Sequence, residues 1–379
     1  MKILIVNYEY PPLGGGGGVA TKQLAEHLAE RHEVHVLTSR HTGLAREETV
    51  DGVRIHRVWI TPRKELATAT LASMISFVPT AFWYGLGLVR REQFDVINAQ
   101  FVIPSGLPAS WLARWFNVPF VLSFVGGDVF DPTKGTSPHR HPMLRALVRH
   151  VARAARRCTA ISEDTKRRAR ELHQVSNEIT VTHLGIEPRV VAPASRIELS
   201  LPDDVPVFVS IGRLIARKGY DVLIEAWRTV PAAHLVIIGQ GFLEAELKAH
   251  AKRIGLAERI HFVGFVSEEK KLQYLRAATG YVSGAVHEGF GIVFLEAMEA
   301  GLPIVATDVG GQIDFLTPGQ NALLVEPDNI GGFSTAVKQL INEPELTKRM
   351  GATNKEKVKQ FYLSETVSVF ESVLTEASK

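Results

Sequence analysis

Two glutamates eight residues apart, Glu288 and Glu296, mark the part of this sequence with the most specific chemistry. Residues 283–298 follow an apolar stretch, turn through Gly289-Phe290-Gly291 and enter a helical pattern near Ile292. Glu296 stands among apolar neighbours, which are poor surroundings for a carboxylate without hydroxyl or cationic partners. Two carboxylates beside backbone N–H groups suit the binding of a sugar and a ribose by their hydroxyls. The alternative to a binding site is that Glu288 only favours a helix N-terminus and that Glu296 is exposed to solvent.

Two cationic residues, Arg213 and Lys218, follow the first apolar stretch of the second half of the chain, residues 207–211. We predict that this stretch is a parallel strand, and doubly wound folds bind ligands at the carboxyl ends of such strands. An arginine fork together with a lysine point charge suits a diphosphate. The alternative is ordinary surface charge in a loop.

A run of glycines from Gly14 to Gly18 follows the first predicted strand and precedes a helix expected to begin near Val19. Glycines expose backbone N–H groups, and a helix N-terminus adds partial positive charge, so the natural ligand is a phosphate or diphosphate. The run does not match the dinucleotide-binding pattern, because Ser39-Arg40 stands where an acidic residue is expected after the second strand. The alternative is a flexible turn.

Short apolar runs alternate with longer amphipathic runs along the whole chain, which indicates parallel sheets covered by helices. The pattern occurs twice, so we predict an α/β protein with two doubly wound, Rossmann-like domains. The predicted strands are residues 3–7, 34–38, 95–98, 120–123, 158–161, 207–211, 235–238, 260–263, 281–283 and 304–307. The predicted helices of the first half include residues 19–30, 107–116 and 143–156.

Residues 188–206 contain four prolines and no periodic pattern, so we expect a linker there. The expected domains are residues 1–190 and 191–360, with a final helix over residues 361–379 that packs back toward the first domain. A length of 379 residues suits two domains.

The composition excludes several classes of protein. With 45% hydrophobic and 22% charged residues the chain is not disordered, collagen-like or a coiled coil. Its single cysteine, Cys158, excludes a disulfide framework and a cysteine-built zinc site, and it indicates a reducing compartment. No signal-peptide pattern follows Lys2, so we expect a cytoplasmic protein.

Positive charge is concentrated in the first half of the chain. Residues 1–190 contain 24 Lys and Arg against 17 Asp and Glu, and the remainder contains 19 against 23. Much of the excess lies in residues 140–170, which form either a solvated helical face or a surface attracted to an anionic partner. Without interleaved aromatic residues we do not expect a nucleic-acid partner.

Residues 66–89 carry no charge over a length that matches a membrane span. Serines and threonines dilute this stretch and Pro79 interrupts it. We therefore expect a helix packed in the first domain, with an apolar edge that contacts lipid, rather than a spanning helix. Together with residues 140–170 it predicts peripheral, salt-sensitive contact with the inner face of the membrane.

The segment Glu288-Gly289-Phe290-Gly291, with Glu296 eight residues after Glu288, resembles the signature of the retaining glycosyltransferases of family 4, which have the GT-B fold. The resemblance extends over essentially the whole chain in the expected order. It includes Gly212-Arg213-Leu214 with Lys218-Gly219, Gly239-Gln240-Gly241, Gly301-Leu302-Pro303 with Gly310-Gly311, and the amino-terminal glycine run. It implies two facing Rossmann-like domains with a cleft between them.

The resemblance also implies roles for single residues. Arg213 and Lys218 would bind the diphosphate of a nucleotide-sugar donor, and Glu296 would bind the ribose hydroxyls. Glu288 would hold the transferred sugar, aided by the backbone N–H groups of three residues that follow it, Phe290, Gly291 and Ile292.

Further roles concern the base, the acceptor and metals. The base would lie near Val266, and Gly15, Gly16 and Gly17 would approach the donor phosphate or the acceptor. Relatives of this kind use no metal, and the chain has no Asp-x-Asp motif. We therefore expect neither a metal nor a cofactor, only a UDP-, GDP- or ADP-sugar as donor.

One position departs from the family pattern. Many relatives have a histidine before the Gly-x-Asp that follows a middle strand of the first domain, but here Val125 precedes Gly126-Gly127-Asp128. Valine can neither transfer a proton nor donate a hydrogen bond, so Asp128 becomes the polar catalytic candidate. We expect a structural role for His183, which lies near the domain boundary.

The resulting hypothesis is a cytoplasmic, retaining glycosyltransferase that acts on a glycan, a lipid-linked acceptor or a small metabolite. In the front-face mechanism that the resemblance implies, the leaving phosphate accepts the proton of the acceptor. The alternatives are another GT-B activity, either an inverting transferase or a sugar-nucleotide epimerase, and a nucleotide-binding protein without catalysis.

Overall fold

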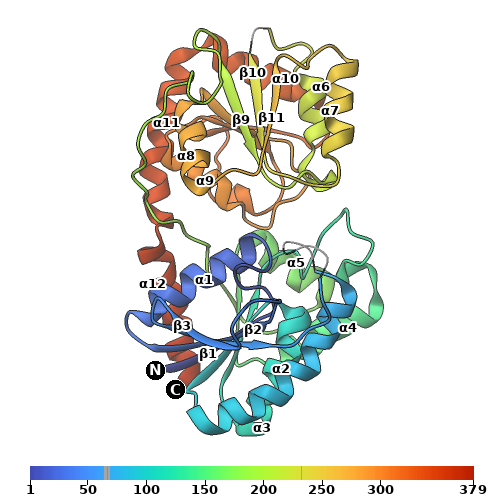
Figure 1. The fold of residues 1–379 in the computed structure, drawn as a ribbon, viewed down its shortest axis with the longest axis vertical. Helices are drawn as coiled ribbons and strands as arrows, with labels where there is room; N and C mark the ends of the chain where they lie inside the picture. Colours follow the sequence, from blue (N-terminus) through green and yellow to red (C-terminus); the bar gives the residue numbers. More distant parts are fainter. Residues whose placement is uncertain (64–65, 67–68, 232) are drawn as a thin grey trace. The chain divides into compact units, whose positions relative to one another are not determined.

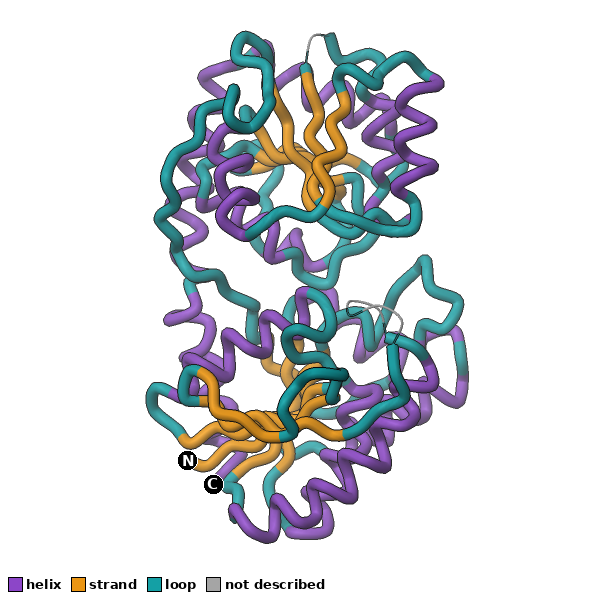
Figure 2. Tube along the Cα trace, in the orientation of Figure 1, coloured by secondary structure: helices purple, strands orange, loops and turns teal. Residues whose placement is uncertain are grey.

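The computed structural model describes residues 1–63, 66, 69–231 and 233–379, which form two compact units. Unit 1 comprises Met1–Gly185 and Leu363–Lys379, and unit 2 comprises Ile186–Tyr362. Each unit contains one sheet with helices on both faces (Figures 1 and 2). The predicted α/β class with two doubly wound domains is confirmed. The units divide at residues 185/186 and 362/363. The proline-rich linker predicts the first boundary at 190/191, and the expected final helix places the second at 360/361.

The sheet of unit 1 has the strand order β3-β4-β2-β1-β5-β6-β7-β8. All neighbouring strands are parallel except β3, which is antiparallel to β4. The chain moves outward from the central β1 in one direction and then restarts at β5 on the other side, as in a Rossmann fold. The strands are β1 Lys2–Asn7, β2 Glu33–Ser39, β3 Glu47–Val50, β4 Val53–Val58, β5 Val96–Gln100, β6 Phe120–Phe124, β7 Arg157–Ala160 and β8 Ile179–Val181.

Alternate residues of these strands face two separate apolar layers. Ile3 and Ile5 of β1 pack under α1 and α12, and Leu4 and Val6 pack under the helices on the opposite face. The N- and C-termini lie close together at one edge of this unit (Figure 1), where Ser378 donates a hydrogen bond to the sulfur of Met1. The helices of unit 1 are α1 Gly16–Ala29, α2 Leu71–Glu92, α3 Leu107–Phe116, α4 Pro142–Ala154, α5 Glu163–His173 and α12 Leu363–Ser378.

Helix α2 contains most of the uncharged stretch, of which residues 67 and 68 lie outside the described residues. It begins with a capping box formed by Thr70 and Ser73, because each side chain satisfies a backbone N–H of the other residue. Among the described helices it is the one long and apolar enough to cross a membrane. In this fold it packs instead on β2 and β4 and beside α3.

Unit 2 repeats the same construction with the strand order β11-β10-β9-β12-β13-β14, all neighbours being parallel. Its strands are β9 Val207–Ile211, β10 His234–Ile238, β11 Ile260–Gly264, β12 Gly280–Ser283, β13 Ile304–Thr307 and β14 Ala322–Val325. Its helices are α6 Tyr220–Ala226, α7 Glu244–Arg253, α8 Glu268–Ala277, α9 Ile292–Glu299, α10 Ile330–Asn342 and α11 Pro344–Lys357.

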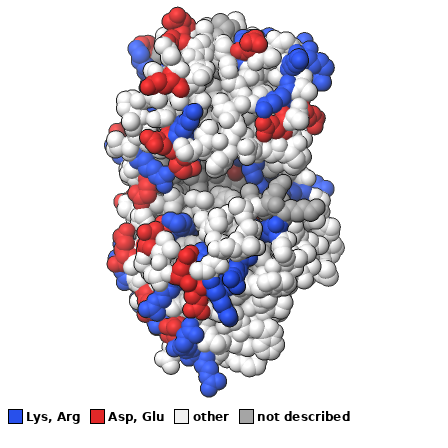
Figure 3. Space-filling view, viewed as in Figure 1, with Lys and Arg blue, Asp and Glu red and all other residues white. Residues whose placement is uncertain are grey.

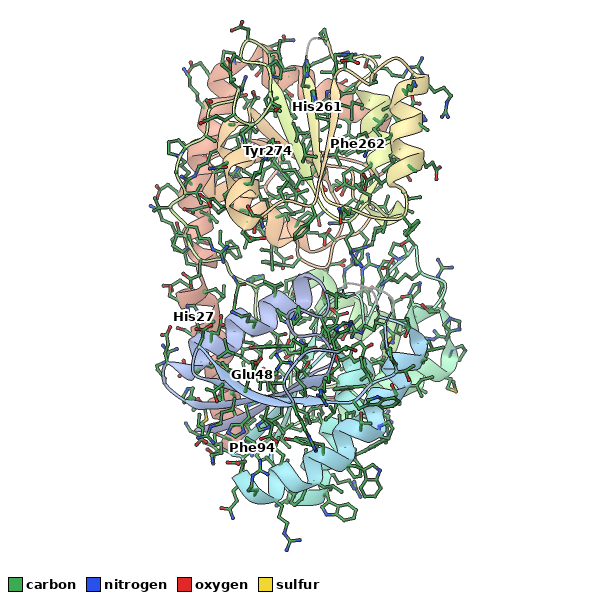
Figure 4. All side chains as sticks on the ribbon, viewed as in Figure 1. His27, Glu48, Phe94, His261, Phe262 and Tyr274 are labelled. Atoms are coloured by element: carbon green, nitrogen blue, oxygen red, sulfur yellow. The ribbon has the colours of Figure 1, made fainter. Side chains whose placement is uncertain are left out.

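The proline-rich segment 188–206 is fastened to unit 2 by side-chain hydrogen bonds. Buried Tyr274 of α8 (Figure 4) donates from its hydroxyl to the carbonyl of Leu199. Arg196 donates to the carbonyls of Ala277 and Val205, so both partners lie within unit 2.

Candidate active site

The two loops that carry the predicted ligands of unit 2 begin at the point where its strand order reverses. The first follows β9 and the second follows β12, and these strands are neighbours in the sheet. A side chain on Gly219 would collide with the carbonyl oxygen of Gly284, and Val286 donates its N–H to the carbonyl of Arg217 over 2.9 Å. The loops therefore touch through their backbones at the switch point, which is where doubly wound sheets bind ligands.

Glu288 is held by cations from the first loop. The Nζ atom of Lys218 donates to Oε2 of Glu288 over 2.6 Å, and Nη1 of Arg217 lies 3.8 Å from Oε1. Arg217 also donates to the carbonyl of His287 over 3.0 Å. Burial alone would raise the pKa of Glu288, but the charges of Lys218 and Arg217 lower it to about 2. Glu288 is thus an ionised acceptor with a fixed orientation.

The predicted diphosphate ligands are placed differently from each other. Lys218 is largely buried against Glu288, whereas the side chain of Arg213 is exposed and accessible to a ligand. Arg217, which was assigned no role from the sequence, lies beside the same carboxylate. Its role follows from the contact between the two loops, for which the sequence contained no separate signal.

Helix α9 begins directly after the Gly289-Phe290-Gly291 turn. Gly291 has φ +92°, and a side chain there would meet the ring of Phe294, so the turn requires glycine at this position. No side chain caps the helix and its first turn contains no acid. The ring of Phe290 is buried against Phe315, with centroids 5.1 Å apart. The backbone N–H groups around Ile292 thus begin an uncapped helix, which suits an anion or a hydroxyl oxygen.

Glu296 lies on α9 and is buried with an incompletely satisfied carboxylate. Its Oε1 accepts from Nζ of Lys271 over 2.7 Å, and its Oε2 is buried without a hydrogen-bond partner among the described residues. Burial raises the pKa of Glu296, and the charge of Lys271 opposes that shift. A buried acceptor without a donor is costly unless a ligand supplies one. Lys271 comes from α8, and sequence spacing gave no indication of this pairing.

The predicted base-binding region follows β11. Val266 is half-buried, while the neighbouring Phe265 has 80% of its surface exposed. A side chain on Gly239, after β10, would collide with the carbonyl of Gly212, after β9. The carboxyl ends of β9, β10 and β11 are therefore packed together beside the Lys218–Glu288 pair.

The glycine run in unit 1 begins a helix earlier than the sequence suggested. Helix α1 starts at Gly16 rather than near Val19, because the last three glycines of the run adopt helical angles. Gly15 and Gly16 face open space, whereas a side chain on Gly17 would meet the ring of Phe101. Among the described residues no side chain caps helix α1, and its first turn contains no acid, although Gly15 donates its N–H to Glu9 over 3.3 Å.

A buried arginine stands beside this run. Arg63 is 6% exposed, its guanidinium lies 4.2 Å from the ring centroid of Tyr8, and its Nη1 donates to the carbonyl of Leu66. The same carbonyl accepts the N–H of Gly14. Nε and Nη2 of Arg63 are buried with no hydrogen-bond partner in the described part of the chain. This residue was not predicted, because a single arginine before the uncharged stretch has no motif around it.

The carboxylate of Asp128, the predicted catalytic candidate of unit 1, is enclosed by backbone N–H groups. It is buried, Oδ2 accepts from the N–H of Val102 over 2.8 Å, and Oδ1 accepts from the N–H of Val125 over 3.0 Å. Burial raises the pKa of Asp128 to about 6, although these N–H groups lower it. These two hydrogen bonds join the loops that follow β5 and β6.

Val125 and His183 line one small pocket at the carboxyl ends of the unit 1 strands. Its wall is mixed, with apolar side chains from α12 opposite hydroxyl groups from the sheet. Contributors besides these two include Gly17, Thr21, Thr159 and Val367. Val125, which stands where many relatives have a histidine, therefore lines a pocket of unit 1.

These features are those of a nucleotide-sugar transferase: two doubly wound units, a fixed carboxylate with cations at a switch point, and a buried carboxylate in the helix that follows it. Two family models match the chain, "Glycosyl transferase 4-like domain" over residues 15–185 and "Glycosyl transferases group 1" over residues 192–357. The chain belongs to the glycosyltransferases with the GT-B fold.

Known proteins resemble the chain over nearly its full length. N-acetyl-alpha-D-glucosaminyl L-malate synthase of Bacillus anthracis is 25% identical, with 98% of this chain and 97% of the relative covered. Sucrose-phosphate synthase from Thermosynechococcus elongatus has a TM-score of 0.86 at 19% identity, with 99% of both chains covered. Anabaena HepE, solved in complex with UDP, has a TM-score of 0.80 at 19% identity, with 99% and 100% covered.

Proposed function

We propose that this protein transfers a glycosyl group from a nucleoside-diphosphate sugar to an acceptor hydroxyl with retention of the anomeric configuration. The observation that carries the proposal is the buried Oε2 of Glu296, which lacks a donor within the described residues. Glu296 lies in α9, the helix that directly follows the fixed Glu288. Ribose hydroxyls are suitable donors for that atom. The complex of HepE with UDP supports a uridine nucleotide as the first candidate.

The departing diphosphate is stabilised by charges of unit 2. Arg213, Arg217 and Lys218 surround the switch point, and the uncapped N-terminus of α9 adds partial positive charge. Fixed charges of this kind are most effective where charge develops in the transition state. With these cations in place, we propose that no divalent metal is needed and that the leaving phosphate accepts the acceptor proton.

Glu288 holds the transferred sugar by its hydroxyl groups. Its oxygens are oriented by Lys218 and Arg217, and its low pKa keeps it a hydrogen-bond acceptor at neutral pH. In this proposal Asp128 positions the loops of unit 1 and does not exchange a proton with substrate.

We place the acceptor on unit 1, near Gly15, Gly16 and the pocket that Val125 lines. Nε and Nη2 of Arg63, which have no hydrogen-bond partner among the described residues, are suited to a carboxylate or phosphate on that acceptor. Two of the similar proteins are named for malate and for sucrose phosphate, which are anions of this kind. A glycan or lipid-linked acceptor that carries phosphate satisfies the same requirement.

The decisive experiment combines donor binding with product stereochemistry. We expect calorimetry against UDP-, GDP- and ADP-sugars to identify one donor, and NMR of the product to show the anomeric configuration of that donor. An inverted product would indicate an inverting transferase, and release of a free epimer would indicate an epimerase. Binding of a donor without its slow hydrolysis would indicate a nucleotide-binding protein without catalysis.

The single cysteine, Cys158, is buried and unpaired, in keeping with the cytoplasmic location that we propose.

A further inference from the structure

The outward side of α2 is apolar along almost its whole length. Exposed residues recur every fourth position and thus form one stripe along the helix. Residues 71–89 contain no charge, and only 33% of the most apolar 18-residue window is buried. A surface helix of a soluble domain normally carries polar residues on this side. The stripe consists of Leu71, Ala72, Ile75, Pro79, Trp83 and Gly87.

Helix α3 extends this stripe into a broader face. A side chain on Gly85 would collide with Leu112, so the two helices lie in close contact. Phe82 links them, with its ring centroid 5.7 Å from those of both Trp83 and Trp111. Trp115 follows one turn later on α3. We call Leu71, Ile75, Trp83, Trp111 and Trp115 the tryptophan face; the exposed fractions of these side chains are 71%, 63%, 71%, 41% and 72%.

Exposed arginines accompany the tryptophan face: Arg90 and Arg91 stand in the last turn of α2, and Arg114 stands between Trp111 and Trp115 on α3. We call these three the arginine border. Over α2 and α3 the surface is largely without charged side chains (Figure 3), and α2, α3 and α4 together contain one acid, Glu92. Glu92 is already paired with Arg91 and Lys2. The arginines of these helices are Arg90, Arg91, Arg114, Arg145, Arg149 and Arg153.

Much of the basic stretch after α4 is neutralised within the chain. Arg168 and Arg167 donate to Asp164, and Arg157 donates to Glu178. Lys166 pairs with Glu163 in the same helix. Arginines outnumber acids on α2, α3 and α4, so these helices carry a net positive charge toward a partner.

We propose that the tryptophan face is a docking surface for the headgroup region of an anionic lipid bilayer. Tryptophans with apolar neighbours enter the boundary between headgroups and acyl chains, while nearby arginines contact the phosphates. A symmetric dimer through this face would bring the arginine border of one copy against that of the other, which opposes self-association. Docking of this kind is independent of the sugar-transfer proposal, because it involves no residue of the candidate active site.

Flotation of the full chain with vesicles tests the proposal. The probes are vesicles of phosphatidylcholine alone and of phosphatidylcholine with phosphatidylglycerol, at about 0.05 and about 0.5 M salt, where screening differs strongly. We expect flotation with the anionic vesicles at low salt and loss of most binding at high salt. Trp83→Gln/Trp115→Gln should weaken vesicle binding at least about tenfold, and Trp83→Phe/Trp115→Phe should retain most of it.

Two controls separate docking from misfolding. Ile197→Gln/Val369→Gln removes apolar side chains that are exposed on other surfaces, 73% and 45%, and should float like the wild type. Acyl-chain-brominated lipids should quench part of the tryptophan fluorescence of the wild type and leave unchanged the contribution of Trp227, which is buried in unit 2. Failure to float with anionic vesicles at low salt would overturn the proposal. A dimer in solution that Trp83→Gln/Trp115→Gln dissociates would overturn it in favour of a second copy of the chain.

Discussion

Lys218 and Glu288 are seventy residues apart in the chain, yet their side chains form a hydrogen-bonded ion pair of 2.6 Å at the switch point of unit 2. The pair exists because β9 and β12 are neighbours in the sheet, so the loops that follow them meet. One carboxylate is thereby fixed in orientation, and a lysine is held where a diphosphate is expected to arrive.

The carboxylate of Glu296 is expected to contribute directly to nucleotide affinity. Glu296→Ala should weaken binding of UDP by about 1.5–3 kcal/mol, the range for hydrogen bonds to a charged group. Free nucleotide and intact donor should be affected alike, since both contain the ribose. Calorimetry checks this, with Glu268→Gln as the control, because Glu268 also pairs with Lys271 but is mostly exposed. Unchanged affinity in a folded Glu296→Ala would remove Glu296 from the site.

The cations of unit 2 should matter more during reaction than during binding. Single Arg213→Ala and Lys218→Ala variants are expected to lower kcat by about a hundredfold, the order found when a preorganised charge-stabilising group is removed, and also to weaken donor affinity. Steady-state kinetics of donor hydrolysis measure both effects. A chelator should leave the wild-type rate unchanged, and strict dependence on a divalent ion would contradict this arrangement.

The ion pair of Glu288 predicts a stability difference that depends on pH. Its pKa is lowered to about 2 in the folded chain, below the ordinary value of 4.5, so the pair stabilises the fold above pH 4.5. That contribution is lost as the pH falls from 4.5 toward 2. Urea unfolding of wild type and Glu288→Gln should therefore give free energies that converge over this range. A constant difference would show that Glu288 is not the titrating partner.

Asp128 is expected to affect stability rather than nucleotide binding. In Asp128→Ala the buried N–H groups of Val102 and Val125 lose their acceptor, which should cost about 1–3 kcal/mol in the free energy of unfolding. Affinity for UDP should stay unchanged, because Asp128 and the nucleotide ligands belong to different units. A folded variant of wild-type stability that has lost donor turnover would restore Asp128 as a catalytic candidate.

Arg63 is expected to bind an anion. Inorganic phosphate should raise the Tm of the wild type, and Arg63→Gln should abolish that rise. Arg57→Gln is a matched control, since Arg57 is equally buried but already pairs with Glu48 over 2.6 Å. Arg57→Gln should lower the Tm and keep the response to phosphate. The same response in Arg63→Gln as in the wild type would assign the anion to another group.

Local pattern in the sequence was sufficient to predict the doubly wound class and most of the central strands. The runs at 3–7, 34–38 and 207–211 are buried on both faces, so they appear as continuous apolar stretches. Four strands at or next to the sheet edges were missed. β3 is largely exposed and β8 is only three residues long, and β4 and β14 were also not predicted. The chemical nature of Glu288, Glu296, Arg213 and Lys218 could also be inferred from residue type and spacing.

The partners of those residues were decided only by the tertiary structure. Lys271 reaches Glu296 from another helix, Arg217 reaches Glu288 across a contact between two loops, and Arg63 approaches the glycine run through Leu66. The apolar stretch of α2 likewise had two interpretations until its packing on β2 and β4 left one side uncovered. Sequence periodicity determines which side of an element is apolar, because that depends on neighbours a few residues away. Which cation meets which carboxylate depends on the order of strands in the sheet, and that order is set by packing between segments far apart in the chain.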